Sequence, residues 1–165
     1  MNTTMIDTRE LRNALGCFAT GITVITALDE SKAPVGLTAN SFTSLSLDPP
    51  LVLFCVDRTI KSFQAIHANR HFAVNILRED QENISRQFAK SGADKWSGIK
   101  FETWDTGCPI LGGCIANLEC DVEQVFEGGD HIIVVGKVRR MVFDQDSECR
   151  PLLYFKGKYG AVARS

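Results

Sequence analysis

The sequence lacks an apolar run long enough to span a membrane, and its start, MNTTMIDTRE, lacks the basic and apolar regions of a signal peptide. It also lacks an excess of basic residues, since 18 Lys and Arg stand against 20 Asp and Glu and give a formal net charge of -2 at pH 7. Such a chain has no basic stripe to neutralise nucleic-acid phosphates. We therefore expect a soluble, cytoplasmic protein that binds neither membranes nor nucleic acids.

Six cysteines are present, but their spacing does not favour a metal site. Cys108, Cys114 and Cys120 lie six residues apart, which is too wide for a CxxC knuckle, and no histidine lies beside them at ligand spacing. Without an export signal we expect reduced thiols. Cys55 and Cys120 fall in apolar strand patterns, where a thiol usually behaves as a small core residue.

Catalytic constellations are also missing from the sequence. No serine triad or carboxylate dyad emerges, and no GxGxxG fingerprint is present. His67 and His71 are four residues apart, but Asn69-Arg70 predicts a helix end between them. We therefore expect surface or capping roles for these two histidines, and no bound metal.

The composition suits one domain over residues 1–165, with 44% hydrophobic residues for a core and no repeat or linker to divide it. Alternating and β-branched segments predict a mainly β protein with peripheral helices, in which six or seven mostly antiparallel strands form a closed or nearly closed barrel. The expected helices cover residues 6–18, 61–70 and 79–92. The expected strands cover residues 21–28, 35–40, 51–56, 71–77, 115–126 and 131–143, with a short strand and a tail in 150–162. Residues 93–113 are expected to form a long loop.

The first predicted helix carries one apolar face. Leu11, Leu15 and Phe18 recur at helical spacing, and Asp7 or Thr8 can cap the helix start. We expect this face to pack on the barrel.

The most informative stretch runs from Gly36 to Ser62. Its first part is rich in short polar side chains, and bulky side chains there would keep a flat ring away. The polar residues are Thr38, Asn40, Ser41, Thr43, Ser44 and Ser46. The pattern is typical of a flavin cradle, although two buried strands whose hydroxyls pair with the backbone would show it equally well.

A turn with phosphate-binding character ends the same stretch. The apolar run LVLFCV follows the Asp48-Pro49-Pro50 turn and leads into DRTIKS, at the start of a predicted helix. Free amides and the positive end of that helix favour an anion there.

The string GLTANSFTSLSLDPPLVLFCVDRTIKSF resembles the signature of the short-chain flavin reductase family. The similarity continues through FAVNIL, SRQFA, KW, EC, GDH and PLLYFKGKYG, and so covers nearly the whole chain. It implies a Greek-key-like split β-barrel and a homodimer with the cofactor near the subunit interface. It also implies an NAD(P)H:flavin oxidoreductase that uses FMN or FAD, with NADH or NADPH as donor, and supplies reduced flavin to a partner monooxygenase.

The resemblance also implies site residues. Flavin-contacting residues are expected on the hydroxyl-rich segment and at the end of the following strand: Thr38, Ala39, Asn40, Ser41, Ser44, Leu45, Cys55, Val56 and Asp57. Phosphate contacts are expected from Arg58, Lys61 and Ser62, although relatives often carry a serine-rich turn where this chain has DRTIKS. The cleft is further expected to be bordered by Phe88, Ala89, Asp94, Lys95 and Trp96, with Thr20 and Gly21 near both cofactors or in an ordinary strand entry.

The nicotinamide side is assigned in the same way. His131 of the GDH turn is the catalytic candidate, because an imidazole can bond the carboxamide or assist product release; the alternative is a histidine that closes a hairpin. Tyr154 and Tyr159 either flank the nicotinamide or pack the last strand. Trp96 either shields the flavin from water or fills the core.

The implied chemistry needs no protein nucleophile, because a hydride passes directly between two cofactor rings held roughly 3–3.5 Å apart. Two alternatives remain open. One is a flavoprotein with tightly bound FMN that reduces another acceptor, and the other is a non-catalytic flavin- or haem-binding barrel.

Overall fold

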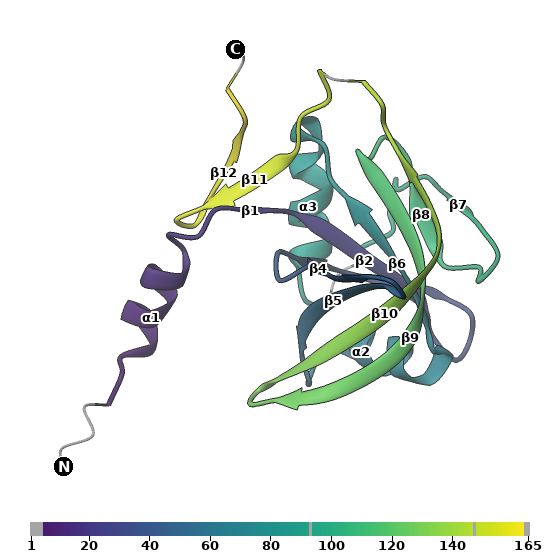
Figure 1. Ribbon diagram of the computed structural model, residues 1–165, viewed down its shortest axis with the longest axis horizontal. Helices are drawn as coiled ribbons and strands as arrows, with labels where there is room; N and C mark the ends of the chain where they lie inside the picture. Colours follow the sequence, from purple (N-terminus) through teal and green to yellow (C-terminus); the bar gives the residue numbers. More distant parts are fainter. Residues whose placement is uncertain (1–4, 93, 147, 164–165) are drawn as a thin grey trace.

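The computed structural model describes residues 5–92, 94–146 and 148–163, and these are mostly β-structure with three α-helices (Figure 1). None of the helices in these ranges has the length and apolar character needed to cross a bilayer. The helices are α1 (Thr8–Leu15), α2 (Lys61–Asn69), the 3-10 helix η1 (Glu79–Gln81) and α3 (Glu82–Ala89). The strands are β1 (Thr20–Gly21), β2 (Thr23–Leu28), β3 (Pro34–Ala39), β4 (Thr43–Leu47), β5 (Pro50–Asp57), β6 (His71–Ile76), β7 (Phe101–Thr103), β8 (Pro109–Leu111), β9 (Ala116–Gly128), β10 (His131–Phe143), β11 (Leu152–Phe155) and β12 (Lys158–Ala161).

Seven strands form one antiparallel sheet in the order β3-β2-β6-β9-β10-β5-β4. The two end strands, β3 and β4, follow each other in the sequence, so the sheet curls round to bring them together. Ser41, in the link between them, donates a hydrogen bond to the Cys55 carbonyl (2.8 Å) and accepts one from the Cys55 amide (3.0 Å). This is the split β-barrel expected from the sequence, with a side chain bridging its open seam.

The barrel core forms because alternate residues of each strand point inward. On β5 the inward side chains are Val52, Phe54 and Val56, and the Phe54 ring meets Phe72 of β6 edge-on at 5.2 Å. A Cβ atom at Gly136 would collide with the Phe72 ring, so glycine at this position makes room for the aromatic pair.

Helices α2 and α3 cover the barrel as the sequence predicts. Ile66 of α2 and Phe88 of α3 are each 1% exposed. The helix break expected at Asn69-Arg70 is confirmed, because Arg70 takes the left-handed conformation directly after α2. Helix α3 ends at Ala89, three positions earlier than the expected end at Gly92.

The expected packing of the first helix is wrong. No residue of α1 is buried, and the helix stands away from the barrel (Figure 1). Leu11, Leu15 and Phe18 are 45%, 65% and 78% exposed. The end of the helix instead meets the β11–β12 turn, where the Lys156 amide donates to the Gly16 carbonyl (2.8 Å).

Two segments contain more structure than expected. Part of the predicted long loop pairs as the β7–β8 hairpin. The predicted tail pairs as β12 against β11, and β11 also pairs with β1, which makes a small three-stranded sheet beside the barrel (Figure 1).

Candidate functional site

The hydroxyl-rich segment lies between α3 and the small sheet. Thr38 donates its hydroxyl to the Ser85 carbonyl of α3 (2.7 Å), and the Ser85 hydroxyl bonds the Tyr159 hydroxyl (3.0 Å). Asn40 donates its amide to the Thr20 hydroxyl (3.3 Å). Four of these residues were expected near the cofactors, and the structure places them in one contiguous group.

Both candidate tyrosines belong to this group. The rings of Tyr154 and Tyr159 meet edge-on with centroids 5.3 Å apart, and the Arg86 guanidinium lies 4.6 Å from the Tyr159 ring centroid. Tyr154 is also the strand partner of Thr20. The two rings therefore join the small sheet to α3 and to the hydroxyl-rich segment.

The end of β5 meets the β9–β10 hairpin. Asp57 pairs across the sheet with His131, and its carboxylate accepts bonds from the Thr59 amide (2.8 Å) and hydroxyl (2.7 Å). These two bonds hold the pKa of Asp57 below its ordinary value. The Asp57 carboxylate therefore accepts its hydrogen bonds from Thr59, within the turn that follows β5.

Arg58 is held by the β9–β10 hairpin. Its guanidinium bonds Glu127 (2.5 Å) and the Gly129 carbonyl (2.6 Å), both on the β9–β10 hairpin. Arg58, one of the three expected phosphate contacts, therefore already bonds residues far along the chain, which local sequence does not reveal.

His131 lies at the same hairpin, exposed to solvent. Its Nδ1 lies 2.7 Å from the carboxylate of Asp130, and this proximity lowers the pKa of Asp130. The pairing fixes one ring nitrogen and leaves Nε2 for another partner.

The start of α2 has no side-chain cap, since its N-cap residue is Ile60. The Phe63 amide donates to the Ile60 carbonyl (3.0 Å), whereas the amides of Lys61 and Ser62 are available to an outside acceptor. Lys61 is exposed, whereas Ser62 is buried and donates its hydroxyl to the Gly36 carbonyl (3.2 Å).

Lys95 approaches the same place from the loop after α3. Its ammonium donates to the carbonyls of Gly36 (3.1 Å) and Phe88 (3.0 Å). Because Ser62 shares the Gly36 acceptor, the lysine places a positive charge beside the α2 start. Burial lowers the pKa of Lys95.

Phe88 and Trp96 form the aromatic wall of this region. Their rings meet edge-on at 4.9 Å, and Trp96 also meets Phe101 at 5.2 Å. Trp96 is half-buried, so its indole both packs against a buried cluster that includes Leu77 and Phe88 and keeps an accessible edge.

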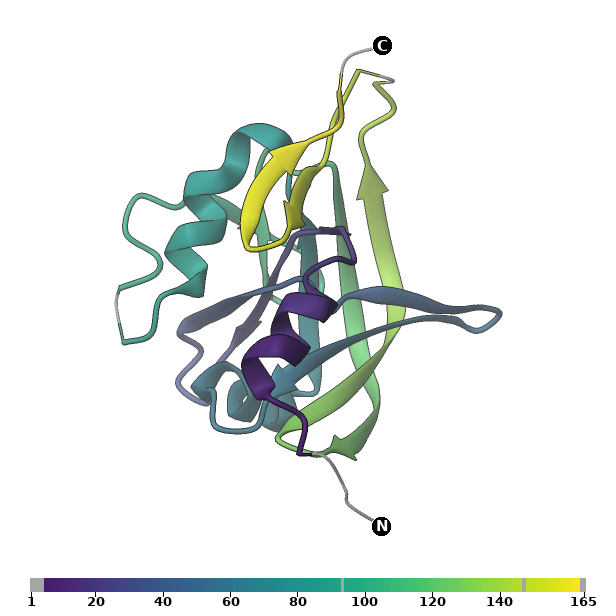
Figure 2. The same ribbon diagram turned by 90° about the vertical axis from the view of Figure 1, so that its left-hand side faces the viewer.

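The remaining candidates are placed less directly. Ala39 and Val56 point into the core, so only their backbone groups can reach a ligand. Cys55 is half-buried on β5, and Ala89 is exposed at the end of α3. Ser44 and Leu45 are exposed on β4, whose hairpin with β5 projects from the barrel (Figure 2).

The polar groups of this region can be compared with those that a flavin ring and its phosphate need. The hydroxyls of Thr38, Ser41 and Ser62 donate to backbone groups, as the alternative interpretation predicts. The groups left for a ligand include the carbonyl oxygen of the Asn40 side chain, the Ser44 hydroxyl, the Lys61 ammonium, the third N–H of Lys95 and the free amides at the start of α2. A cation beside uncapped amides suits a phosphate, and polar side chains along an open strand suit a flat ring, so the residues fit a flavin.

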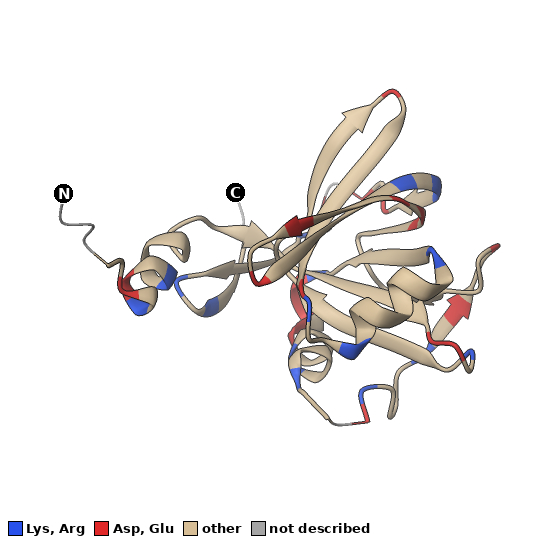
Figure 3. Ribbon diagram, turned by 90° about the horizontal axis from the view of Figure 1, so that it is seen from below, with Lys and Arg blue, Asp and Glu red and all other residues tan. Residues whose placement is uncertain are grey.

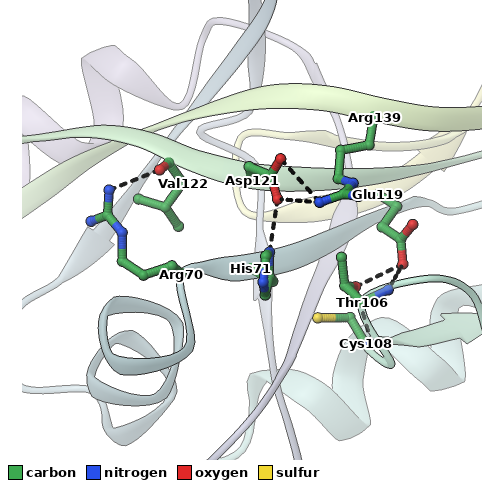
Figure 4. A network of polar contacts seen from close by, with 8 residues as sticks. All are labelled: Arg70, His71, Thr106, Cys108, Glu119, Asp121, Val122 and Arg139. Atoms are coloured by element: carbon green, nitrogen blue, oxygen red, sulfur yellow. Dashed lines mark hydrogen bonds and ion pairs between the residues drawn. The ribbon is translucent and has the colours of Figure 1, made fainter.

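A second polar cluster occupies the outer face of the sheet (Figure 4). Glu119 is fully buried and accepts from the Thr106 amide (2.8 Å) and hydroxyl (2.7 Å), whereas Asp121 pairs with both His71 (2.8 Å) and Arg139 (3.1 Å). A cavity of about 280 Å³ adjoins it, lined in part by His71, Thr106 and Cys108. Sequence patterns did not indicate this cluster, since its members come from β6, β9, β10 and the loop before β8.

The described residues contain no group of three His, Cys, Asp or Glu side chains able to hold a metal ion. All six cysteines lie in the described ranges as free thiols. Burial raises the pKa of Cys114 to about 11 and also raises that of Cys120. The raised pKa disfavours the thiolate at the buried Cys120 and at the half-buried Cys114.

Comparison with known proteins identifies the family. The chain matches the flavin reductase like domain over residues 15–163. It belongs to the flavin reductase family. It is therefore an oxidoreductase, as the sequence predicts.

Several relatives match this flavin reductase over most of their length. It is 43% identical over 157 residues to the reductase subunit HsaB of a flavin-dependent monooxygenase from Mycobacterium tuberculosis, covering 95% of this chain and 83% of the relative. The crystal structure of nitrilotriacetate monooxygenase component B from Mycobacterium thermoresistibile superposes with a TM-score of 0.91 at 43% identity, covering 95% and 87% of the two chains. The NADH:FAD oxidoreductase SgcE6 from Streptomyces globisporus, in complex with NAD and FAD fragments, gives 0.88 at 37% identity, with coverage of 95% and 93%.

Proposed function

We propose that this flavin reductase transfers a hydride from NADH or NADPH to FMN or FAD and supplies the reduced flavin to a separate monooxygenase component. Two relatives carry names that support this: HsaB is a reductase subunit of a monooxygenase, and SgcE6 is an NADH:FAD oxidoreductase. The observation in this chain that carries the proposal is the position of the Thr38–Ser41 segment. It has the paired tyrosines and α3 on one side and the β5 end, with the open start of α2, on the other.

The residues of the site bind and orient rather than react. A bound flavin supplies the two-electron acceptor, and rate comes from holding the two cofactor rings in contact. Asn40 and Ser44 orient the ring, while Lys61, Lys95 and the α2 amides hold the phosphate. The half-buried Trp96 excludes water from the ring.

His131 is assigned to the nicotinamide. Asp130 holds its Nδ1, which leaves Nε2 to bond the carboxamide of the donor. Its strand partner, Asp57, ends β5 beside the proposed flavin site, so His131 lies at the edge where the donor enters.

We also propose that the enzyme is a homodimer with the site near the subunit interface. The apolar face of α1 has no cover in the described chain. Leu47 at the β4–β5 hairpin is similarly 93% exposed. A second copy would remove both surfaces from water.

The proposal is tested by following NADH and NADPH oxidation with riboflavin, FMN and FAD in parallel. We expect oxidation that depends on added flavin, with flavin binding at about micromolar affinity. An Asn40→Ala variant should raise the KM for flavin by about tenfold at an unchanged fold, whereas Asn83→Ala, an exposed asparagine on α3, should not.

Other outcomes would point elsewhere. A yellow protein that keeps its flavin through gel filtration and reduces a different acceptor would indicate a flavoprotein with bound FMN. A flavin or haem spectrum without consumption of either nicotinamide would indicate a binding protein, and so would contradict the proposed reaction.

A further inference from the structure

A cavity of about 650 Å³ is bordered by the end of α1 and the β11–β12 turn. Arg12, Asn13 and Cys17 line it from the helix side, and Tyr154 and Lys156 line it from the hairpin. None of the residues expected at the flavin ring or its phosphate lines it. Its volume lies within the range of small-molecule sites.

The charge of the cavity is positive. Arg12 and Lys156 supply one cation from each wall, and no carboxylate lines it. Within the described ranges, neither cation forms an ion pair with a side chain. Basic residues on both α1 and the adjacent hairpin are visible in Figure 3. Two cations beside the side-chain amide of Asn13 suit a phosphate group.

The hairpin wall is fixed in place. Lys156 and Gly157 form the tight turn between β11 and β12, with φ of 48° and 76°, in the left-handed region. The Lys156 amide donates to the Gly16 carbonyl at the end of α1 (2.8 Å). The backbone bond therefore holds the lysine beside the helix that carries Arg12.

The cavity adjoins the proposed cofactor site through Tyr154. Its ring lines the cavity and also meets Tyr159, whose hydroxyl bonds Ser85 beside Thr38. Tyr154 is the strand partner of Thr20, which accepts the Asn40 amide. Tyr154 therefore belongs both to the wall of the cavity and to the group of residues around Thr38.

We propose that the cavity binds a phosphate group of a nucleotide cofactor through Arg12 and Lys156. The inference rests on the proposed function, because it assigns a second contact region to the same cofactors. Three phosphates share this chemistry: the diphosphate of NADH or NADPH, the 2′-phosphate of NADPH, and the adenylate phosphate of FAD.

The test compares Arg12→Gln, Lys156→Gln and their combination with wild type. Each is assayed with NADH, NADPH and reduced nicotinamide mononucleotide as donors, and with FMN and FAD as acceptors. Arg9→Gln removes the same charge from α1 at a position outside the cavity, and serves as the matched control. Melting curves by circular dichroism confirm that each variant is folded.

We expect each single variant to raise the KM of the bound cofactor by about three- to fivefold, with little change in kcat. A rise for NADPH alone assigns the 2′-phosphate. An equal rise for NADH and NADPH, absent for the mononucleotide, assigns the dinucleotide diphosphate, and a rise for FAD but not FMN assigns the adenylate. The affected KM should also rise with salt in wild type and less in the double variant.

An unchanged KM for all five cofactors in folded variants of an active enzyme would overturn the inference, as would an equal effect of Arg9→Gln. Absence of turnover in wild type with every pair of cofactors would instead contradict the proposed function.

Discussion

Gly36 sits where three parts of the proposed site meet. Its carbonyl accepts from both Ser62 and Lys95, and a Cβ atom at this position would lie 2.7 Å from the Phe88 ring. The ring is fully buried, so it has little room to move. The close approach of β3 to α3 therefore depends on the absence of a side chain at Gly36.

We predict that Gly36→Ala lowers the free energy of unfolding by about 1–3 kcal/mol, because overpacking displaces Phe88. It should also weaken flavin binding, since the shift moves α3 and the loop that carries Lys95. Urea unfolding and a flavin titration measure the two effects. Gly160→Ala, where nothing lies within 4 Å of the added Cβ, is the control, and a similar stability for both variants would contradict the prediction.

For single residues, the sequence predicts which side chains lie near the proposed site better than it predicts the groups that they bond. Thr38 is expected at the flavin, and Tyr159 either at the nicotinamide or packed in the last strand; in the structure the two are linked through Ser85. Arg58 was expected at a phosphate and instead bonds Glu127, which lies 69 positions along the chain. A surface guanidinium takes whichever acceptor the fold brings near, and local sequence does not specify that acceptor.

Two side chains attach the loop after α3 to its neighbours: Gln87 ties it to α3, and Lys95 ties it to α3 and to the barrel strand β3. Gln87 donates to the carbonyls of Lys95 (3.0 Å) and Ser97 (2.9 Å), and the Lys95 ammonium reaches back to Gly36 and Phe88. These bonds position Trp96 against Phe88. The loop therefore depends on a partly buried cation.

We predict that Lys95 makes a pH-dependent contribution to stability. Burial lowers the pKa of Lys95 in the folded chain below the ordinary value of 10.5. Between these two pKa values the unfolded chain binds more protons than the folded chain, so the contribution of Lys95 to the free energy of unfolding rises with pH. The difference in this free energy between wild type and Lys95→Met should therefore increase as pH rises toward 10.5 and level off above it.

Chemical denaturation at several pH values between 7 and about 11 measures this difference, and subtraction removes the titration of groups common to both proteins. Lys90→Met, which removes a cation from an exposed position at the end of α3, controls for the loss of charge. A wild-type to Lys95→Met difference that stays constant across the range is the contradicting result.

Elements were predictable where periodicity is strong and partners are local. The long strands β9 and β10 and the core faces of α2 and α3 follow directly from alternation and helical spacing. Helical spacing also predicts the apolar face of α1, but the expectation that this face packs on the barrel is wrong. An amphipathic pattern shows that a face needs cover and does not say which molecule covers it.

Across the whole molecule, exposed apolar surface gathers on three features. The exposed apolar side chains lie on α1 and the β4–β5 hairpin, which project from the barrel, and on the second half of β10, which runs beside β9 (Figures 1 and 2). The described pairing of β10 with β5 ends at Lys137, so beyond it β10 has β9 on one side and no described strand on the other. Met141 and Phe143, on this unpaired part, are 64% and 57% exposed. An open strand edge flanked by apolar side chains is a surface that folded proteins usually cover.

We predict that a second copy covers this surface, so that light scattering after gel filtration gives a mass of twice 18.2 kDa. Leu15→Glu/Phe18→Glu should give the single-chain mass, because two carboxylates would oppose burial of the α1 face. Gln64→Glu/Asn83→Glu adds the same charges to exposed positions of α2 and α3, and should keep the double mass. A single-chain mass for wild type at micromolar concentration would remove the basis for a dimer.

The same variants also test whether the second copy contributes to the cofactor site. Neither Leu15 nor Phe18 lies among the residues assigned to the flavin or to the nicotinamide. If the α1 variant alone loses both its partner and flavin-dependent oxidation of the nicotinamide, the second copy contributes to the site.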